Sequence, residues 1–134
     1  GKQRGGLGMR RDYLFPDHEV TFSILADRDR WGPWGLFGGQ PGQKASYILN
    51  PDKEAVKLSS KTTIELKPGD VVSYRTCGGG GYGPLEDRNP KAVLNDVREG
   101  KISLERARNI YRVAIDTTTW TVNKPETMKL RSDR

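Results

Sequence analysis

The sequence predicts a mainly β fold: a β-sandwich or barrel-like domain, followed by two short C-terminal helices and an extended tail. Several short segments rich in Val, Ile, Phe, Tyr and Thr alternate apolar and polar residues, as half-buried strands do. The 134 residues include 16 glycines and 8 prolines, which favours many turns. Beyond residue 84 the apolar spacing becomes helical. We therefore expect residues 1–83 to form a β-rich domain with a long Gly/Trp loop, and residues 84–134 to form a tail that packs on partner subunits.

The predicted strands follow from three stretches. In EVTFSIL, residues 19–25, Val20, Phe22 and Ile24 share one face of a strand with one buried side. ASYILNP is a second short strand, followed by a turn at NPDKE. TTIELKPGDVVSYRT, residues 62–76, is typical of two strands joined by a tight turn. Pro68 at the second turn position and Gly69 at the third indicate a type II turn.

The helices are predicted by their end signals. Asn89 is placed as an N-cap, Pro90 as the first helical residue and Gly100 as the stop. Ser103 is the N-cap of a second helix, whose apolar face would hold Leu104, Ala107, Ile110 and Tyr111. AIDTTTWTVN has β propensity, and KPETMKLRSDR is expected to be a loose tail.

Composition excludes several classes of protein. The net charge of +6 lies at the two ends, +4 in residues 1–11 and +2 in residues 124–134, while residues 12–123 hold 15 basic and 15 acidic residues. A neutral body disfavours a nucleic-acid-binding domain. No segment has the length and hydropathy of a transmembrane helix or a secretory signal, so a cytoplasmic location without membrane contact is expected. A single cysteine and a single histidine exclude an internal disulfide and a cysteine- or histidine-clustered metal site.

The stretch RTCGGGGYGPLEDRNP carries four consecutive glycines, Gly78 to Gly81, then Tyr82 and Gly83. It matches G-x-G-x-x-G formally, but no helix follows at once and no βαβ unit surrounds it, so it is not a dinucleotide fingerprint. Two interpretations remain. The run is a bend at which the chain passes close to another backbone, or its amides line a cleft for a ligand or partner.

Two further stretches are candidates for contacts. RWGPWGLFGGQPG carries Trp31, Trp34 and Phe37 in a loop, which either caps its own core, docks onto a neighbouring subunit, or forms a stacking platform for carbohydrate. Arg4 beside Gly5 and Gly6 either places a guanidinium against a phosphate or carboxylate or belongs to a solvated basic end. His18 is expected in a surface turn and Cys77 at a strand end, and no catalytic constellation is found.

Three pieces in this order resemble one family: GKQRGGLGMRRDYLF, RDRWGPWGLFGGQPG, and the long stretch from SKTTIELKPGDVV through GGGGYGPL to RARNIYRV. Together they are similar to the C-terminal end of hydantoinase B-type proteins. These comprise the B-type components of ATP-dependent N-methylhydantoinases, the matching half of 5-oxoprolinases, and subunits of acetone and acetophenone carboxylases. The family commonly has an aspartate before PL, whereas here Gly83 meets Pro84 directly.

This resemblance implies a small subunit or C-terminal segment of an ATP-dependent cyclic-amide hydrolase or ketone carboxylase, structural or cleft-completing rather than catalytic alone. Its partners would be larger A-type and B-type subunits. ATP with magnesium and a metal ion would bind to those subunits, and this chain would bind no cofactor. A stand-alone protein-interaction module without enzymatic activity is the alternative.

The candidate ligand or partner contacts are few, and none is catalytic or metal-binding. They are Arg4, Gly5, Gly6, Trp31, Trp34, Gly78, Gly79, Gly80, Gly81, Tyr82 and Gly83.

Overall fold

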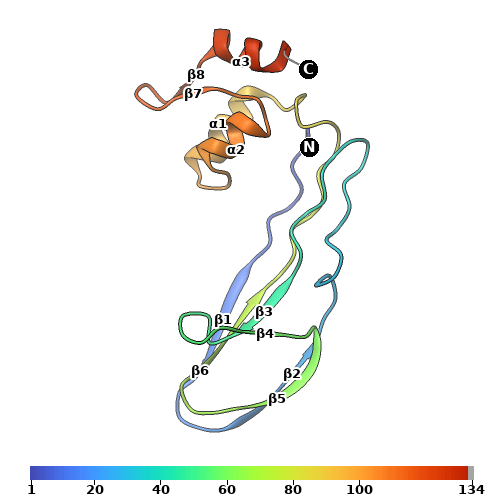
Figure 1. Ribbon diagram of the computed structural model, residues 1–134, viewed down its shortest axis with the longest axis vertical. Helices are drawn as coiled ribbons and strands as arrows, with labels where there is room; N and C mark the ends of the chain where they lie inside the picture. Colours follow the sequence, from blue (N-terminus) through green and yellow to red (C-terminus); the bar gives the residue numbers. More distant parts are fainter. Residues whose placement is uncertain (133–134) are drawn as a thin grey trace. The chain divides into compact units, whose positions relative to one another are not determined.

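The computed structural model describes residues 1–132, in which eight strands and three helices are found (Figure 1). In chain order they are β1 (Arg10–Phe15), β2 (Val20–Leu25), β3 (Ser46–Leu49), β4 (Val56–Leu58), β5 (Lys61–Leu66), β6 (Asp70–Arg75), α1 (Pro90–Arg98), α2 (Leu104–Asn109), β7 (Ile115–Asp116), β8 (Thr121–Val122) and α3 (Lys124–Ser132). The prediction of a mainly β fold is confirmed, and the strands in the described residues form open antiparallel sheets rather than a closed barrel. None of the described helices is long and apolar enough to cross a membrane.

The chain forms two compact units, and each combines segments that lie far apart in the sequence. The first unit comprises Gly1–Arg4, Gly35–Gln40 and Gly81–Arg134, and the second comprises Gly5–Trp34 and Pro41–Gly80. The expected division of the chain into domains at residues 83 and 84 stays a prediction.

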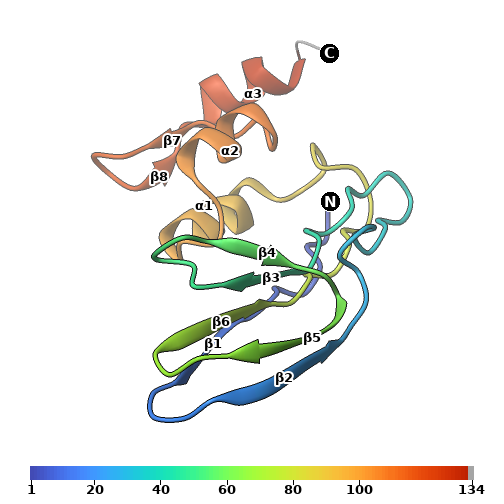
Figure 2. The same cartoon turned by 60° about the horizontal axis from the view of Figure 1, so that its bottom comes forward.

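The second unit contains a four-stranded antiparallel sheet in the order β1-β6-β3-β4 and a separate pair, β2-β5 (Figure 2). The strands of the pair β1-β6 continue along the chain into those of the pair β2-β5, because β1 leads into β2 and β5 leads into β6. The predicted turn between β5 and β6 is confirmed. Gly69 has a φ of +85°, and the Asp70 N–H closes the turn by donating to the Lys67 carbonyl oxygen at 3.0 Å.

Residues from both sheets form the core of the second unit. Ile24 and Tyr47 are buried together with Ala45, and Phe22 and Tyr74 pack against them. The predicted alternation along β2 is confirmed, since Ile24 and Phe22 contact this core. On the opposite face of β2, the Thr21 hydroxyl donates to Glu65 at 2.8 Å and Ser23 bonds Thr63 at 2.9 Å. The sequence analysis missed the three-residue strand β4, which is too short to show a periodic pattern.

The buried Tyr47 predicts a loss of stability at alkaline pH. Burial, and then the hydroxyl of Tyr74, raise the pKa of Tyr47 from 10.0 to about 12. A raised pKa in the folded state means that the folded chain holds this proton more tightly than the unfolded chain. The contribution is therefore complete below pH 10, and we expect about 2–3 kcal/mol of unfolding free energy to be lost between about pH 10 and pH 12.

Urea unfolding followed by circular dichroism at several pH values measures this loss. The matched variant is Tyr47→Phe, which keeps the ring but removes the titrating hydroxyl, whose hydrogen bond to the Asp27 carbonyl is long at 3.3 Å. Its unfolding free energy should fall less steeply over the same range. An equal fall in both proteins would contradict the assignment to Tyr47.

In the first unit, the predicted ends of the first two helices are confirmed. The Asn89 side chain accepts from the Lys91 N–H ahead of α1, Pro90 begins the helix, and Gly100 follows it with a φ of +68°. The Ser103 side chain accepts from the Arg106 N–H at the start of α2. The core of this unit contains four buried residues from α1, α2 and the segment after α2, namely Val93, Ala107, Tyr111 and Val113. On the predicted apolar face of α2, Leu104 and Ile110 are exposed.

The β propensity predicted for AIDTTTWTVN is confirmed, because Ile115–Asp116 and Thr121–Val122 form the hairpin β7-β8. The expectation that KPETMKLRSDR is a loose tail is wrong for the residues described, since Lys124–Ser132 form α3; Asp133 and Arg134 lie outside the described residues. The Asn123 side chain accepts from the Glu126 N–H at 3.1 Å, and the buried Thr127 hydroxyl accepts from the Ala114 N–H at 3.1 Å. The sequence signal was the N-x-x-E spacing of Asn123 and Glu126, with Pro125 at the second helical position, which the lack of an apolar stripe obscured.

Candidate functional site

In the second unit, the beginning of the glycine run lies directly against the N-terminal glycines. The Gly79 N–H donates to the Gly6 carbonyl oxygen at 2.8 Å, and the Thr76 N–H donates to the Met9 carbonyl oxygen at 2.9 Å. A Cβ atom built on Gly5 would lie 2.5 Å from the carbonyl carbon of Gly79. The two backbones therefore approach each other more closely than any residue with a side chain allows.

The Gly/Trp loop makes a similar approach within the same unit. A Cβ atom on Gly42 would lie 2.6 Å from the Gly78 carbonyl oxygen. Gly42 itself donates its N–H to the Pro33 carbonyl oxygen at 2.8 Å. Gly78 and Gly79 thus contact both the N-terminal segment and the Gly/Trp loop through backbone atoms.

In the first unit, the end of the glycine run is held by hydrogen bonds on two sides. Tyr82 exchanges both backbone hydrogen bonds with Gln3, at 2.9 and 3.0 Å. The Gly81 N–H donates to the Gln40 carbonyl oxygen and the Gly83 N–H to the Leu36 carbonyl oxygen, each at 2.9 Å. Gly83 has a φ of +73°, the bend at which the chain leaves toward α1.

These bonds bear on the two interpretations of the run RTCGGGGYG. The amides of Gly79, Gly81, Tyr82 and Gly83 all donate to carbonyl groups of this chain, so these four are not free to cradle a phosphate. The run forms a bend that passes close to other backbones, as the first interpretation predicts. That its residues also contact a ligand or partner stays a prediction.

Arg4 places its guanidinium against a carboxylate of the first unit. Its Nε lies 3.3 Å from Oδ1 of Asp96, and Arg88 donates from Nη2 to Oδ2 of the same carboxylate at 2.7 Å. Asp96 and Arg88 are 4% and 7% exposed, and Arg88 also donates to the Lys2 carbonyl oxygen at 3.1 Å. The ion pairs therefore join the N-terminal segment to α1.

The sequence analysis missed this cluster. Asp96 follows the apolar residues Val93 and Leu94 on α1 and is buried with them. A charged residue on the apolar face of a short helix could have indicated a buried ion pair, because such a residue is seldom buried without a partner. The partners themselves lie too far away in the sequence to be identified by spacing.

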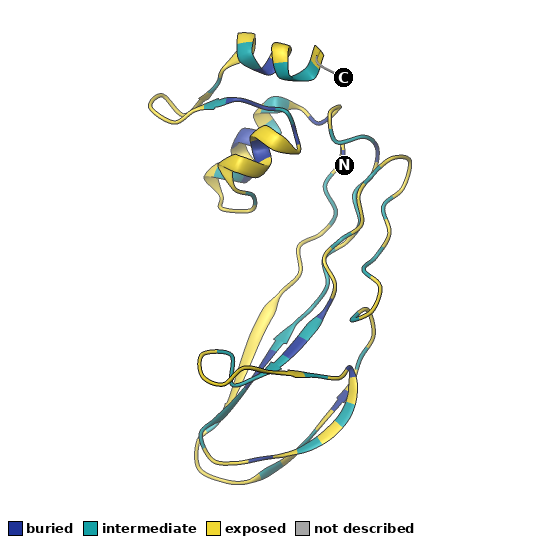
Figure 3. Ribbon diagram, in the orientation of Figure 1, coloured by how far each residue is buried: buried dark blue, intermediate teal, exposed yellow. Residues whose placement is uncertain are grey.

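Much of the exposed surface in the second half of the β-rich region lies in loops, as the colouring by burial in Figure 3 shows, and the aromatic residues of the Gly/Trp loop are exposed. Trp31 and Trp34 in the second unit are 79% and 71% exposed, and Phe37 in the first unit is 75% exposed. The interpretation that the loop caps its own core is therefore wrong. Several large apolar rings exposed within one loop mark an interaction surface more often than a surface that faces only solvent.

In each unit, one exposed aromatic ring of the Gly/Trp loop contacts a neighbouring side chain. In the second unit the guanidinium carbon of Arg28 lies 5.4 Å from the centre of the Trp34 ring, a cation–π contact. In the first unit the Phe37 and Tyr82 rings lie 5.1 Å apart between centroids, and Tyr82 is half-exposed. Trp34 and Phe37 thus each contact a neighbouring side chain while most of their surface stays accessible, as partner-contact residues require.

The remaining reactive side chains do not form a site with one another. Within residues 1–132, no three His, Cys, Asp or Glu side chains lie close enough together to hold a metal ion. His18 is exposed in a bend, and Cys77 is half-buried against the core of the second unit, both as predicted.

Comparisons with known proteins identify the family and relatives of this chain. The family model described as Hydantoinase B/oxoprolinase matches residues 1–85, which include the N-terminal glycines, the Gly/Trp loop and the whole glycine run. An uncharacterized protein of Methanocaldococcus jannaschii is 40% identical over 133 residues, covering 98% of this chain and 23% of that protein. A Pseudomonas protein described as the B-type component of a D-/L-hydantoinase is 35% identical over 134 residues, covering 98% of this chain and 22% of that protein.

Solved structures show the same relation. An ATP-dependent caprolactamase from Pseudomonas jessenii superposes with a TM-score of 0.75 at 26% identity, over 98% of this chain and 24% of that one. A nucleotide-free acetone carboxylase shares the fold, with a TM-score of 0.59 at 22% identity over 74% of this chain and 18% of that one. The chain spans about a quarter of the length of the first relatives it matches. This chain belongs to the hydantoinase B/oxoprolinase family.

Proposed function

We propose that this chain is a structural, cleft-completing component of an ATP-dependent hydrolase of cyclic amides or of a ketone carboxylase. The observation that carries the proposal is the exposed aromatic loop with Trp31, Trp34 and Phe37, which lies within the part of the chain that the family model matches. The chain corresponds to about a quarter of relatives that include a caprolactamase described as ATP-dependent. The surface that would cover the loop belongs, in this proposal, to the larger polypeptides of the same enzyme.

The proposal divides the work between this chain and its partners. Larger B-type and A-type polypeptides would bind ATP with magnesium and a metal ion and would carry the catalytic groups. The closely packed glycine backbones of this chain would hold Trp31 and Trp34 in a fixed geometry for docking. Arg4 and the run Gly78–Gly83 are proposed as further contacts to a ligand or to a partner polypeptide.

Native mass spectrometry of the chain, purified from its source through a tag at the C-terminus, tests the proposal. Recovery together with larger polypeptides that hydrolyse ATP in the presence of a cyclic amide or ketone would support it. Recovery as a free species of 15.0 kDa would overturn it and would favour an independent binding module.

The double variant Trp31→Ala/Trp34→Ala should separate assembly from folding. Each exposed ring that becomes buried at an interface typically contributes about 2 kcal/mol, so we expect association to weaken by about 30-fold or more. The free energy of unfolding should change by less than about 1 kcal/mol, because the rings are exposed and the cation–π contact of Arg28 is weak. Titration of the complex by native mass spectrometry and urea unfolding of the isolated chain measure the two quantities.

The matched control is Leu25→Ala, which removes an 87% exposed apolar side chain outside the loop. It should leave association unchanged. Equal weakening by this control and the double variant would show that the loop has no special part in assembly.

A further inference from the structure

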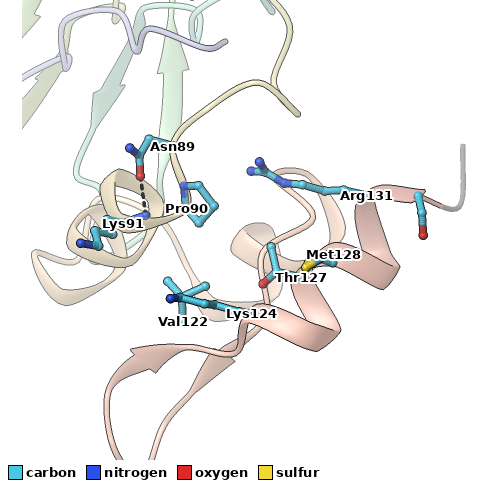
Figure 4. A pocket seen from close by; sticks show the side chains of 9 residues that line it. Asn89, Pro90, Lys91, Val122, Lys124, Thr127, Met128 and Arg131 are labelled. Carbon is cyan, nitrogen blue, oxygen red and sulfur yellow. Dashed lines mark hydrogen bonds between the residues drawn. The ribbon is translucent and has the colours of Figure 1, made fainter.

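In the first unit, the beginning of α1, the strand β8 and the helix α3 surround a cavity of about 720 Å³ (Figure 4). A second cavity of about 370 Å³ follows along α1 and the hairpin β7-β8. The two cavities share Lys91, Val122 and Lys124 as lining residues. We name the two together the α1–α3 groove.

The charge on the α1–α3 groove has one sign. Among the described residues 1–132, its four charged lining residues are all basic: Lys91, Arg98, Lys124 and Arg131. Arg131 is fixed there, because its Nη2 donates to the carbonyl oxygens of Arg88 at 2.7 Å and of Tyr111 at 3.3 Å. The groove thus offers positive potential to whatever occupies it.

The carboxylates nearest to these basic side chains lie outside the lining of the groove. Glu86 and Asp87 act on the charge of Arg131, but neither lines the groove. Glu126 on α3 is paired with Arg108 at 2.7 Å, also outside the groove. An anionic occupant would therefore meet cations, and the part of the lining that the structure describes contributes no acidic side chain that would compete with it.

The positions of the two lysines strengthen this argument. Lys91 is the second residue of α1, and Lys124 is the first residue of α3. A cation at the N-terminal end of a helix is unfavourable, because the helix dipole is positive there. Neither amine has an ion-pair partner among residues 1–132, so helix stability does not account for either lysine.

The floor and walls of the groove are largely apolar. Pro90, Val122 and the 72% exposed Met128 face the larger cavity, and Leu94 and the 40% exposed Trp120 line the smaller one. A nucleic-acid backbone would leave these surfaces without apolar partners. A peptide that alternates carboxylates with apolar side chains would satisfy both the cations and the walls.

We propose that the α1–α3 groove binds an acidic, apolar segment of the larger polypeptide with which this chain assembles. The inference rests on the proposed function, because that function supplies the partner. The relatives are about four times as long as this chain, so most of a family polypeptide lies outside these residues and is available as the occupant.

The test uses complexes recovered from the source and treated with a carbodiimide, which joins a lysine amine to a carboxylate in direct contact without a spacer. We expect mass spectrometry to find Lys91 or Lys124 joined to an Asp or Glu of the larger polypeptide, in a stretch that also carries apolar residues. Joined residues that all involve lysines outside the groove would overturn the inference.

The variant Lys91→Glu/Lys124→Glu tests the same contact by affinity. Glutamate is favourable at the N-terminal end of a helix, where both substituted residues lie, so the variant should fold with an unchanged or raised Tm. Recovery of the partner should fall at least tenfold. The control Lys44→Glu/Lys57→Glu makes the same change in net charge on exposed residues of the second unit and should retain the partner.

The outcomes separate the two proposals. If the unmodified chain is recovered without a larger polypeptide, the proposed function fails, and the inference fails with it. If the unmodified chain and Lys91→Glu/Lys124→Glu recover the partner equally, the inference alone is overturned. If the recovered partner is a nucleic acid, both are overturned.

Discussion

Alanine in place of Gly5 should destabilise the protein by roughly 3 kcal/mol or more, the upper end of the cost of overpacking. The added Cβ would lie 2.5 Å from the Gly79 carbonyl carbon and equally close to the Gly80 carbonyl oxygen. Both obstacles are backbone atoms, which cannot rotate away as the end of a flexible side chain can. The segments would have to separate and would lose the hydrogen bond between Gly79 and Gly6. Urea unfolding followed by circular dichroism measures the change.

The adjacent Gly6 provides the matched control. A Cβ atom there would meet nothing within 4 Å, and the residue does not have a positive φ. Alanine at this position restricts the unfolded chain without strain in the folded one, so the unfolding free energy should stay the same or rise by about 0.4–1 kcal/mol. Similar destabilisation by the two substitutions would mean that the closeness of the backbones at Gly5 is not what the protein depends on.

The second large effect is expected from Asp96→Asn. This change removes the negative charge between the guanidinium groups of Arg88 and Arg4 and leaves the buried Arg88 without its counter-ion. Breaking a buried ion pair on one side typically costs about 3–5 kcal/mol, because the remaining charge is neither paired nor hydrated. We expect a loss of that size in the free energy of unfolding, measured by urea titration.

Asp27→Asn is the control for the loss of one carboxylate. Asp27 pairs with Lys61 at 3.2 Å, but both side chains are exposed, so the pair is screened by water. Its removal should change the unfolding free energy by less than about 0.5 kcal/mol. If Asp96→Asn were as mild as this control, burial of the pair in the first unit would not contribute to stability.

The parts of the fold that follow local rules were predictable from the sequence. The strand β2 was found from its alternation, the turn at Gly69 from Pro68, and the ends of α1 from Asn89 and Gly100. Each of these depends on residues within a few positions of one another. The helix α3 was missed because its polar sequence has no apolar stripe, although its capping signal is local. Its burial depends on the contact of Thr127 with Ala114, which lies outside the helix.

The site was predicted less completely, for a different reason. The composition of the glycine run shows that a close backbone approach is possible, but not that Gly5 and Gly42 are the residues that make it. Likewise, the size of Trp31 and Trp34 indicates that these rings should be buried. It does not indicate whether the covering surface comes from the same chain. These contacts are decided by segments far apart in sequence, which local patterns do not specify.

The way the two units share the chain has a consequence for its synthesis on the ribosome. The second unit needs Gly5–Trp34 together with Pro41–Gly80, so it cannot close until Gly80 has been synthesised. The first unit needs Gly1–Arg4 and Gly35–Gln40 as well as the residues from Gly81 onward. Gly1–Arg4 and Gly35–Gln40 therefore lack their partners in this unit until the residues from Gly81 onward have been synthesised. Such late, non-local closure makes folding slow, and during the delay the glycine backbones and tryptophan rings are open to misassociation. A chaperone or an already folded partner polypeptide could shield them over that interval.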